Sequence, residues 1–318
     1  MRKLLLGFIA CAAIVLPAAA QDKITISIAT GPTGGVYYPM GGGMANILTK
    51  TIPGLVATAE STAGSVANLE FIHTGKADVA LSMADASWDA YKGQEKFRDK
   101  PVGVRALMVL YPNRMHVVTK EGTGINKVAD MRGRRISTGP PRSATELMAA
   151  RLLEASGLDE KDLRRERLTV QESGAALKDG KIDAFFWVGG IPTAAVTDFA
   201  ASPGVKIKMV DHTDALEAMV KKFGPLYVKD VIPANSYPGQ DKTNQVITVW
   251  NVLVASAKLP DELAYNIVKT MFEKKEDMIR VHAEARNFDF QYQTNAAAVI
   301  PFHPGAAKYF AEKGIKLK

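Results

Sequence analysis

Two glycine-rich turns carry the residue types best suited to hold an anion. The first covers residues 30–43 (TGPTGGVYYPMGGG), where Gly34 and Gly35 allow the backbone to approach a ligand closely. A helix is expected to follow, and backbone N–H groups at a helix start attract negative charge. Tyr37 and Tyr38 are predicted to wall a pocket, and Val36 and Tyr37 are included among the predicted ligand-binding residues. The alternative is that these glycines only shape the turn.

The second turn, residues 138–146 (TGPPRSATE), is marked more strongly. Its Ser-Ala-Thr-Glu string has the Ser-x-x-Glu pattern of a capping box, which predicts a helix start. Arg142 stands beside it, and a guanidinium donates two parallel hydrogen bonds to one carboxylate. The alternative is that Arg142 is solvated and the backbone alone binds the ligand. The predicted ligand-binding residues on this turn are Arg142, Ser143, Ala144 and Thr145.

A third group of candidates follows an apolar strand at residues 184–188 (AFFWV). Ligands of open α/β sheets bind at the carboxyl ends of the strands. Trp187 and Gly190 stand at such an end and are therefore predicted to line the same pocket. Ser65 and Asp85 complete the predicted ligand-binding set.

The sequence lacks the usual signatures of catalysis and cofactor binding. None of the five histidines stands in an HExxH pattern, and no G-x-S-x-G elbow or phosphate-binding glycine loop occurs. The single cysteine, Cys11, excludes an intrachain disulfide and a cysteine-based metal site. We therefore predict no catalytic residue, no metal and no cofactor, with most histidines exposed or capping helices.

Strand-like and helix-like stretches alternate along the chain, which predicts an α/β fold that positions these turns. Helices are expected after each glycine turn, at residues 44–51 and through Met148, Leu152 and Ala155. The stretch 105–120 is expected to be extended but broken at Pro112-Asn113. The other predicted strands cover residues 23–29, 78–82, 134–137, 184–188 and 246–256.

The order of these signals occurs twice, which predicts two related α/β lobes. The repeated strings are Thr-Gly-Pro at 30–32 and 138–140, Glu-Ser at 60–61 and 172–173, and Gly-Lys-x-Asp at 75–78 and 180–183. A chain of 318 residues is also long for a single core. We expect residues 21–112 plus 250–318 to form lobe I and 113–249 lobe II. The extended crossings between them would act as a hinge.

The first twenty residues, MRKLLLGFIACAAIVLPAAA, are typical of a cleavable secretory signal peptide. Arg2 and Lys3 precede an apolar stretch that is too short for a membrane span, and three alanines precede Gln21. Its removal leaves a cysteine-free chain of 298 residues. We expect this chain in the periplasm, as a monomer.

Composition and charge exclude several classes of protein. With 47% apolar and 23% charged residues, the chain is neither disordered nor fibrous. The net charge of +7 comes from residues scattered along the chain, and the densest basic run, KDLRRER at 161–167, mixes both signs. We interpret this run as a solvated helix face and expect no nucleic-acid partner.

Several strings resemble the solute-binding subunits of TRAP transporters of the TAXI type (TRAP-associated extracytoplasmic immunogenic proteins). They are IATGPTGGVYYPMGG (28–42), DMRGRRISTGPPRSATE (130–146), DGKIDAFFWVGGIPT (179–193), YPGQDK (237–242) and HPGAAKYFAEKG (303–314). The resemblance implies a periplasmic binding protein, type II-like, with two α/β lobes and a ligand in the cleft. Arg142 and Ala144 stand where glycines are common in this family, so the ligand's identity is not carried over.

The leading hypothesis is a periplasmic receptor for a small organic acid or acidic amino acid, of the glutamate or 2-oxoglutarate kind that the resemblance implies. Its partner would be the membrane subunits of a TRAP transporter. A ligand-sensing partner of a membrane receptor would use the same cleft. An exported enzyme on the same scaffold would need a nucleophile–base or metal constellation.

Overall fold

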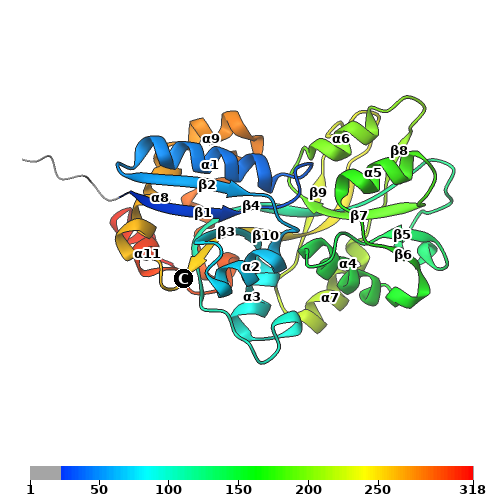
Figure 1. Ribbon diagram of the computed structural model, residues 1–318. Coiled ribbons are helices and arrows are strands. Elements are labelled where there is room, and N and C mark those ends of the chain that lie inside the picture. Colours follow the sequence, from blue (N-terminus) through cyan, green and yellow to red (C-terminus); the bar gives the residue numbers. More distant parts are fainter. Residues whose placement is uncertain (1–22, 318) are drawn as a thin grey trace, which may run out of the picture.

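The computed structural model describes residues 23–317, which form a mixed β-sheet with helices on both sides (Figure 1). The predicted signal peptide, residues 1–20, lies outside the described residues. The strands are β1 (Ile24–Ala29), β2 (Leu55–Glu60), β3 (Val79–Met83), β4 (Val104–Lys120), β5 (Arg135–Ser137), β6 (Arg164–Glu166), β7 (Ala184–Gly189), β8 (Ile207–Met209), β9 (Val228–Ile232) and β10 (Asn244–Ser256). The helices are α1 (Tyr37–Thr51), α2 (Ser65–Thr74), α3 (Ala84–Lys92), α4 (Ala144–Ala155), α5 (Val170–Lys178), α6 (Ala194–Ala200), α7 (Leu216–Phe223), α8 (Asp261–Glu273), α9 (Lys275–Val281), α10 (Asn295–Ala298) and α11 (Pro304–Glu312).

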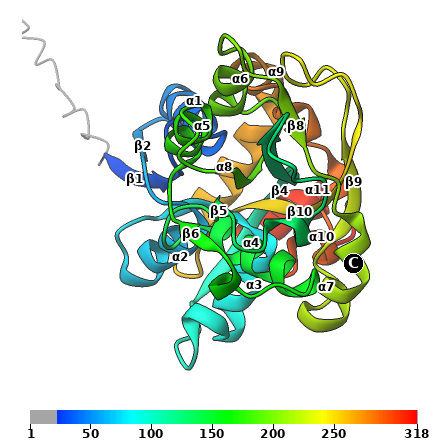
Figure 2. The same ribbon diagram turned by 90° about the vertical axis from the view of Figure 1, so that its right-hand side faces the viewer.

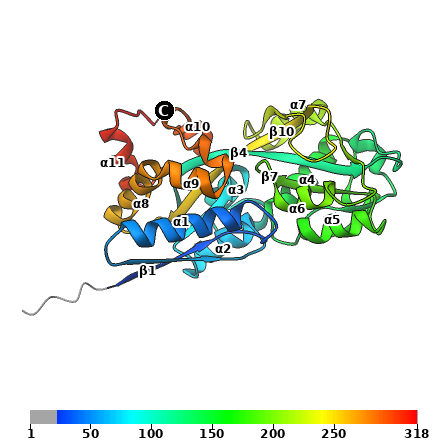
Figure 3. The same ribbon diagram turned by 90° about the horizontal axis from the view of Figure 1, so that it is seen from above.

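Two long strands, β4 and β10, join two groups of elements. The strand order is β2-β1-β3-β10-β4-β7-β5-β6, with β8 beside β4 and β9 beside β10. We define the first lobe as β1–β3 with α1–α3 and α8–α11, and the second lobe as β5–β9 with α4–α7. Strands β4 and β10 pair with each other and run from one lobe into the other (Figure 3). The predicted α/β fold of two lobes with two extended crossings is confirmed.

Each lobe is a layered α/β unit. Strands β1, β2 and β3 are parallel, as are β5, β6 and β7. Helices α5 and α6 cover one side of the second lobe's strands and α4 and α7 the other (Figures 1 and 2). All residues of β3 and β7 are buried, because helices shield both faces of these strands. Over residues 23–317, no helix combines the length and hydrophobicity needed to cross a membrane.

The two Gly-Lys-x-Asp strings occupy equivalent places in the two lobes. The Asp78 carboxylate accepts a hydrogen bond from the Ser27 N–H at 2.9 Å, and the Asp183 carboxylate accepts one from the Arg135 N–H at 2.8 Å. In both cases the aspartate precedes a buried strand and holds the neighbouring parallel strand by its backbone. The predicted internal repeat is therefore a repeat of local structure.

The Glu-Ser pairing proposed within that repeat is wrong. The Thr30 N–H donates to the Glu60 carbonyl at 3.0 Å, and the Thr138 N–H donates to the Glu166 carbonyl at the same distance. Glu60 thus corresponds to Glu166 rather than to Glu172, which instead lies in the first turn of α5. A two-residue string recurs easily by chance, and only the pairing of the strands shows which residues are equivalent.

Other local expectations are corrected by the packing. Helix α1 begins at Tyr37, so residues 37–43 are helical rather than part of the turn. Strand β2 was not predicted, because it lies at the sheet edge and only its first residue is fully buried. The basic run at 161–167 forms a short helical turn and then β6, not a helix face, because β6 pairs with β5 as a charged edge strand.

Strand β4 is not interrupted at Pro112. Pro112 lies opposite Trp250, next to a register shift between Trp250 and Val252. A proline has no N–H to donate, and such an irregularity is where a strand tolerates it. The long crossing therefore stays continuous.

The expectation that most histidines are exposed or cap helices holds for three of five. His73 is exposed, and His282 and His303 accept the first amides of short helices. His116 and His212 are buried, and burial lowers the pKa of each to about 4. Both pair with neighbouring groups, His116 with the Tyr237 hydroxyl and His212 with the Ile247 N–H.

Candidate ligand-binding site

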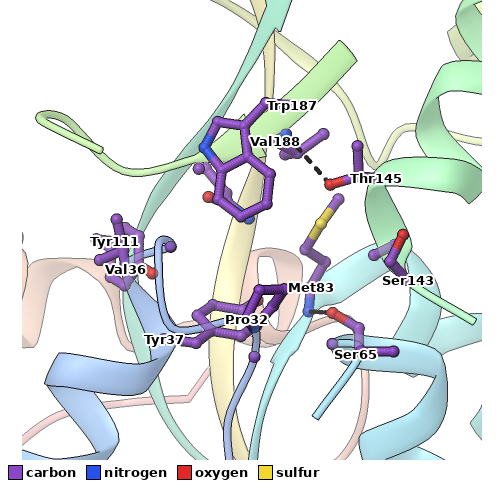
Figure 4. Close-up of a pocket in the computed structure, with 17 residues that line it drawn as sticks. Pro32, Val36, Tyr37, Ser65, Met83, Tyr111, Ser143, Thr145, Trp187 and Val188 are labelled. Carbon is purple, nitrogen blue, oxygen red and sulfur yellow. Dashed lines mark hydrogen bonds between the residues drawn. The ribbon is translucent and has the colours of Figure 1, made fainter. Parts of the chain in front are cut away.

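A cavity lies between the two lobes, at the carboxyl ends of their parallel strands (Figure 4). The first lobe contributes the turn after β1, the start of α2 and the end of β3. The second lobe contributes the start of α4 and the end of β7, and β4 passes along one side. The lining residues are Gly31, Pro32, Gly35, Val36, Tyr37, Ala63, Gly64, Ser65, Met83, Tyr111, Asn113, Ser143, Ala144, Thr145, Trp187, Val188 and Gly189.

Three helices begin at this cavity: α1, α2 and α4. The first N–H groups of a helix have no partner within the helix and carry its partial positive charge. Within residues 23–317, the backbone N–H groups of Tyr37, Ser65, Ala144 and Thr145 donate no hydrogen bond. The cavity therefore presents unused donors from both lobes.

Hydroxyl groups fasten these helix starts to the neighbouring strands. Ser65 Oγ accepts a hydrogen bond from the Met83 N–H at 3.1 Å, and Thr145 Oγ1 accepts one from the Val188 N–H at 3.3 Å. Ser143 is the N-cap of α4, as predicted, and accepts from the Glu146 N–H. A hydroxyl that accepts one hydrogen bond keeps its own hydrogen to donate.

Two aromatic side chains, Tyr37 and Trp187, wall the cavity from opposite lobes, whereas the predicted wall residue Tyr38 is exposed and does not line it. The Trp187 indole N–H donates to Thr193 Oγ1 at 2.9 Å, and the Tyr37 hydroxyl donates to Asn251 Oδ1. A Cβ on Gly35 would lie 2.8 Å from the Trp187 ring, so only glycine allows this turn to pack against the indole. The close approach predicted for Gly35 is thus real, but the group it approaches is Trp187.

The sequence interpretation missed Tyr111 and Asn113, which line the cavity from β4. Their exposed fractions are 0% and 2%. Within the described residues, the Tyr111 hydroxyl and Asn113 Oδ1 have no hydrogen-bond partner. The sequence did offer a signal for them, because both are polar residues at the centre of the predicted extended stretch 105–120.

The cavity combines apolar walls with a few hydrogen-bonding groups and carries no fixed charge. No ionisable acid or base stands among the lining residues of the described chain, apart from the tyrosine hydroxyls. Burial raises the pKa of Tyr37 and of Tyr111 well above the usual value, so both hydroxyls keep their protons. The arrangement suits an anion, because dipoles and hydrogen-bond donors face it and no fixed negative charge does.

Eight predicted residues are brought together by the fold. The residues that line the cavity are Gly35, Val36, Tyr37, Ser65, Ser143, Ala144, Thr145 and Trp187.

Gly34 and Gly190 lie just outside the cavity. The Gly34 carbonyl accepts a hydrogen bond from the Ala195 N–H of the second lobe at 3.2 Å. Gly190 packs against Glu284 and the Tyr111 ring, and its neighbour Gly189 lines the cavity instead. Each of these two glycines is the chain neighbour of a residue that lines the cavity, Gly35 in the first case and Gly189 in the second.

Arg142 does not line the cavity. Its side chain is 54% exposed and forms an ion pair with Glu70 of α2, and its carbonyl accepts from the Ala67 N–H at 3.1 Å. Its φ of +67° is in the left-handed region that favours glycine. The expectation that its guanidinium grips the ligand is therefore not met by this geometry. Both contacts instead connect the two lobes.

Asp85 also lies outside the cavity, in a buried cluster between the lobes. Arg151 of α4 donates to Asp89 of α3 at 2.6 Å and lies 3.7 Å from Asp85. The Tyr227 hydroxyl donates to Asp85 and accepts from Arg151, each at 2.8 Å. All four residues are at most 5% exposed. Two carboxylates thus share one guanidinium, and burial raises the pKa of Asp85 and that of Asp89.

Comparison with solved structures defines the class of fold. The alkanesulfonate-binding protein SsuA from Xanthomonas axonopodis pv. citri is similar with a TM-score of 0.51 and 14% identity, covering 92% of this chain and 85% of that one. A Bordetella bronchiseptica protein has a TM-score of 0.51 and 19% identity, covering 92% and 81%. The periplasmic aliphatic sulphonate-binding protein SsuA from Escherichia coli has a TM-score of 0.46 and 14% identity, covering 90% and 82%. The chain has the fold of the periplasmic binding proteins.

Comparison of the sequence with models of protein families places the chain in a family. The family model described as NMT1-like family matches residues 28–314, and the chain belongs to that family.

Proposed function

We propose that this protein is a periplasmic receptor that captures a small organic acid or acidic amino acid between its lobes and delivers it to a membrane transporter. The observation that carries the proposal is the meeting of three helix N-termini, from both lobes, at one uncharged cavity. An acid group bound there would accept hydrogen bonds from both lobes at once. Binding would therefore favour the arrangement in which the lobes are together.

The walls of the cavity suit a small acid. Each helix start stabilises an anion by about 0.3–1 kcal/mol, and by up to ~2 kcal/mol where water is excluded. Trp187, Tyr37 and Met83 offer apolar surface to the carbon skeleton.

We propose that the lobes open and close about β4 and β10, with residues 21–112 plus 250–318 moving against 113–249. In support, β4 pairs with β7 only from Arg114 onward, and β10 pairs with β3 only from Asn251 onward. Partners therefore change close to the proposed boundaries. The contacts that hold the closed form are Arg151 with Asp89, Arg142 with Glu70, and Gly34 with Ala195.

The resemblance and one of the similar structures support a finer proposal for the transporter and the ligand. The TAXI-like strings favour delivery to a TRAP transporter and a carboxylate ligand. The Xanthomonas relative is described as binding alkanesulfonates and as bound to MOPS, which is also an acid with an anionic head. The TAXI-like strings and the Xanthomonas relative both support an anionic ligand. Titration with carboxylates and with sulfonates distinguishes the two acid groups. The predicted signal peptide supports a location in the periplasm.

A thermal-shift screen tests the proposal. The chain from Gln21 onward would be heated with carboxylates, amino acids and sulfonates, each well above its expected dissociation constant. A ligand at 100 times its dissociation constant adds about 2.7 kcal/mol, which for a chain of this size raises Tm by about 5 °C. If no small acid moves the melting temperature while metal ions or nucleotides do, the proposal is wrong.

A further inference from the structure

Two buried polar groups in the cavity have no partner. The Tyr111 hydroxyl and Asn113 Oδ1 are buried, and within residues 23–317 neither forms a hydrogen bond. Buried polar side chains in folded proteins are nearly always hydrogen-bonded, and an orphan costs about 1–3 kcal/mol. These two groups line the cavity, so a bound molecule is in a position to satisfy them.

Their place on β4 brings them to one side of the cavity. Tyr111 and Asn113 flank Pro112 on β4, and both residues line the cavity. In Figure 4, Tyr111 lies on the side of the cavity opposite Ser143 and Thr145, with Met83 and Trp187 between them. The start of α4 and the Tyr111 position are thus opposite ends of one site.

The backbone around Tyr111 is held firmly. Asn251 of β10 donates from Nδ2 to the Tyr111 carbonyl at 3.3 Å and accepts the Tyr37 hydroxyl through Oδ1. Asn251 is fully buried. The orphan hydroxyl is therefore presented by a fixed strand rather than by a loop, which limits the entropy lost when it binds a partner.

We propose that Tyr111 and Asn113 form a second polar subsite, which selects ligands that carry a hydrogen-bonding oxygen at the end remote from the anion. This inference rests on the proposed function, because it presumes an acid group at the helix starts. The ligand class it defines is a short bifunctional acid, with a second carboxylate, amide or hydroxyl at the Tyr111 end. Tyr111 donates its O–H to that group, and the Asn113 amide supplies an acceptor and two donors.

Matched acids separate this subsite from general anion binding. Isothermal titration would compare glutarate with valerate, glutamate with norvaline, and 2-oxoglutarate with 2-oxovalerate. Each pair has the same five-carbon skeleton and differs by the second acid group. We expect the wild type to prefer the bifunctional member of a bound pair by tenfold or more.

Tyr111→Phe is the decisive variant, because the hydroxyl it removes has no hydrogen-bond partner among residues 23–317. We expect this variant to bind the bifunctional acid about tenfold more weakly than the wild type does, and to bind the monofunctional acid with unchanged affinity. The Tm of the ligand-free variant should equal or exceed that of the wild type, which a structural role of the hydroxyl would not give. Asn113→Ala should reduce the same preference, and Tyr309→Phe, on α11 away from the cavity, should leave it intact.

The outcomes distinguish the inference from the function on which it rests. If the wild type binds none of these acids, nor any other small anion, the proposed function fails and the subsite fails with it. If the wild type binds the two acids of a matched pair with equal affinity, the proposed subsite is wrong and the proposed function stands. A preference that survives both Tyr111→Phe and Asn113→Ala also overturns the subsite, because the second group is then held elsewhere.

Discussion

Replacing Asp89 by asparagine probes the buried cluster between the lobes. Asp89 and Asp85 of the first lobe share the single guanidinium of Arg151 from the second lobe. Asparagine has nearly the same shape as aspartate and keeps an oxygen that accepts from Arg151. The substitution therefore removes one titratable proton while leaving the packing in place.

The magnitude follows from the pKa of this carboxyl group. Burial, followed by the repulsion from Asp85, outweighs the attraction of Arg151 and raises the pKa of Asp89 from 3.8 to about 7. The folded protein thus holds a proton that the unfolded chain releases above about pH 4. This contribution to stability is complete below about pH 4 and is lost as the pH rises through 7. Between pH 5 and pH 8 the loss amounts to roughly 2–3 kcal/mol.

The pH dependence of the stability of the wild type does not by itself isolate the contribution of Asp89. The pKa of His116 and that of His212 are lowered to about 4 by burial, so their contribution is lost as the pH falls below about 6.5. These histidines therefore oppose the trend from Asp89. The difference between wild type and Asp89→Asn cancels them, because both proteins carry the same histidines.

Chemical denaturation at pH 5, 6, 7 and 8 measures this difference. We expect the free energy of unfolding of the wild type relative to Asp89→Asn to be roughly 2–3 kcal/mol greater at pH 5 than at pH 8. Asp179→Asn, at an exposed carboxylate after α5, is the matched control for the loss of one carboxylate at the surface. A constant difference for Asp89→Asn would refute the reasoning, because Asp89 would then ionise alike in the folded and unfolded states.

Three further predictions follow from the account. Arg142→Ala should weaken acid binding by less than about fivefold, because an exposed ion pair contributes at most about 1 kcal/mol; a loss of tenfold or more by calorimetry would put the guanidinium on the ligand. Small-angle scattering should show a smaller radius of gyration when an acid is added, and an unchanged radius in protein shown to be open beforehand would contradict closure. Intact mass of the exported protein should correspond to a chain that begins at Gln21, and a mass that retains Met1 to Ala20, or a lipid on Cys11, would contradict cleavage there.

Much of the architecture was predictable because its signals are local. The strand at β7 is a continuous apolar run, Ser143 is followed three residues later by Glu146, and both Gly-Lys-x-Asp strings end on a strand-holding aspartate. Such patterns reflect interactions over a few residues or burial on both faces. The prediction of two lobes rested on their repetition along the chain.

The parts that were missed depend on contacts between distant residues. Tyr111 and Asn113 stand in a strand whose neighbours are core residues, and only the fold shows that one face borders a cavity. Arg142 was expected at the ligand, but its partner Glu70 lies 72 positions away. Asp85 was included in the site without its partners Arg151 and Tyr227, which belong to the other lobe.

The central claim is that free amides at the helix starts hold the ligand's acid group, and Ala144→Pro tests it most directly. Ala144 is the first residue of α4, and the extended Ser143 before it has φ −97° and ψ 156°, which suit a following proline. Proline is well tolerated there, yet it removes the N–H that faces the cavity. Ala194→Pro, at the exposed first residue of α6, is the matched control in the same lobe.

Calorimetric titration of both variants with an acid that the wild type binds is the deciding measurement. The account predicts that Ala144→Pro loses at least tenfold in affinity, because a hydrogen bond to a charged group contributes about 1.5–3 kcal/mol and the ring also displaces the anion. Ala194→Pro should bind like the wild type. Wild-type affinity in Ala144→Pro, with a normal melting temperature, would contradict the claim that the start of α4 holds the acid group.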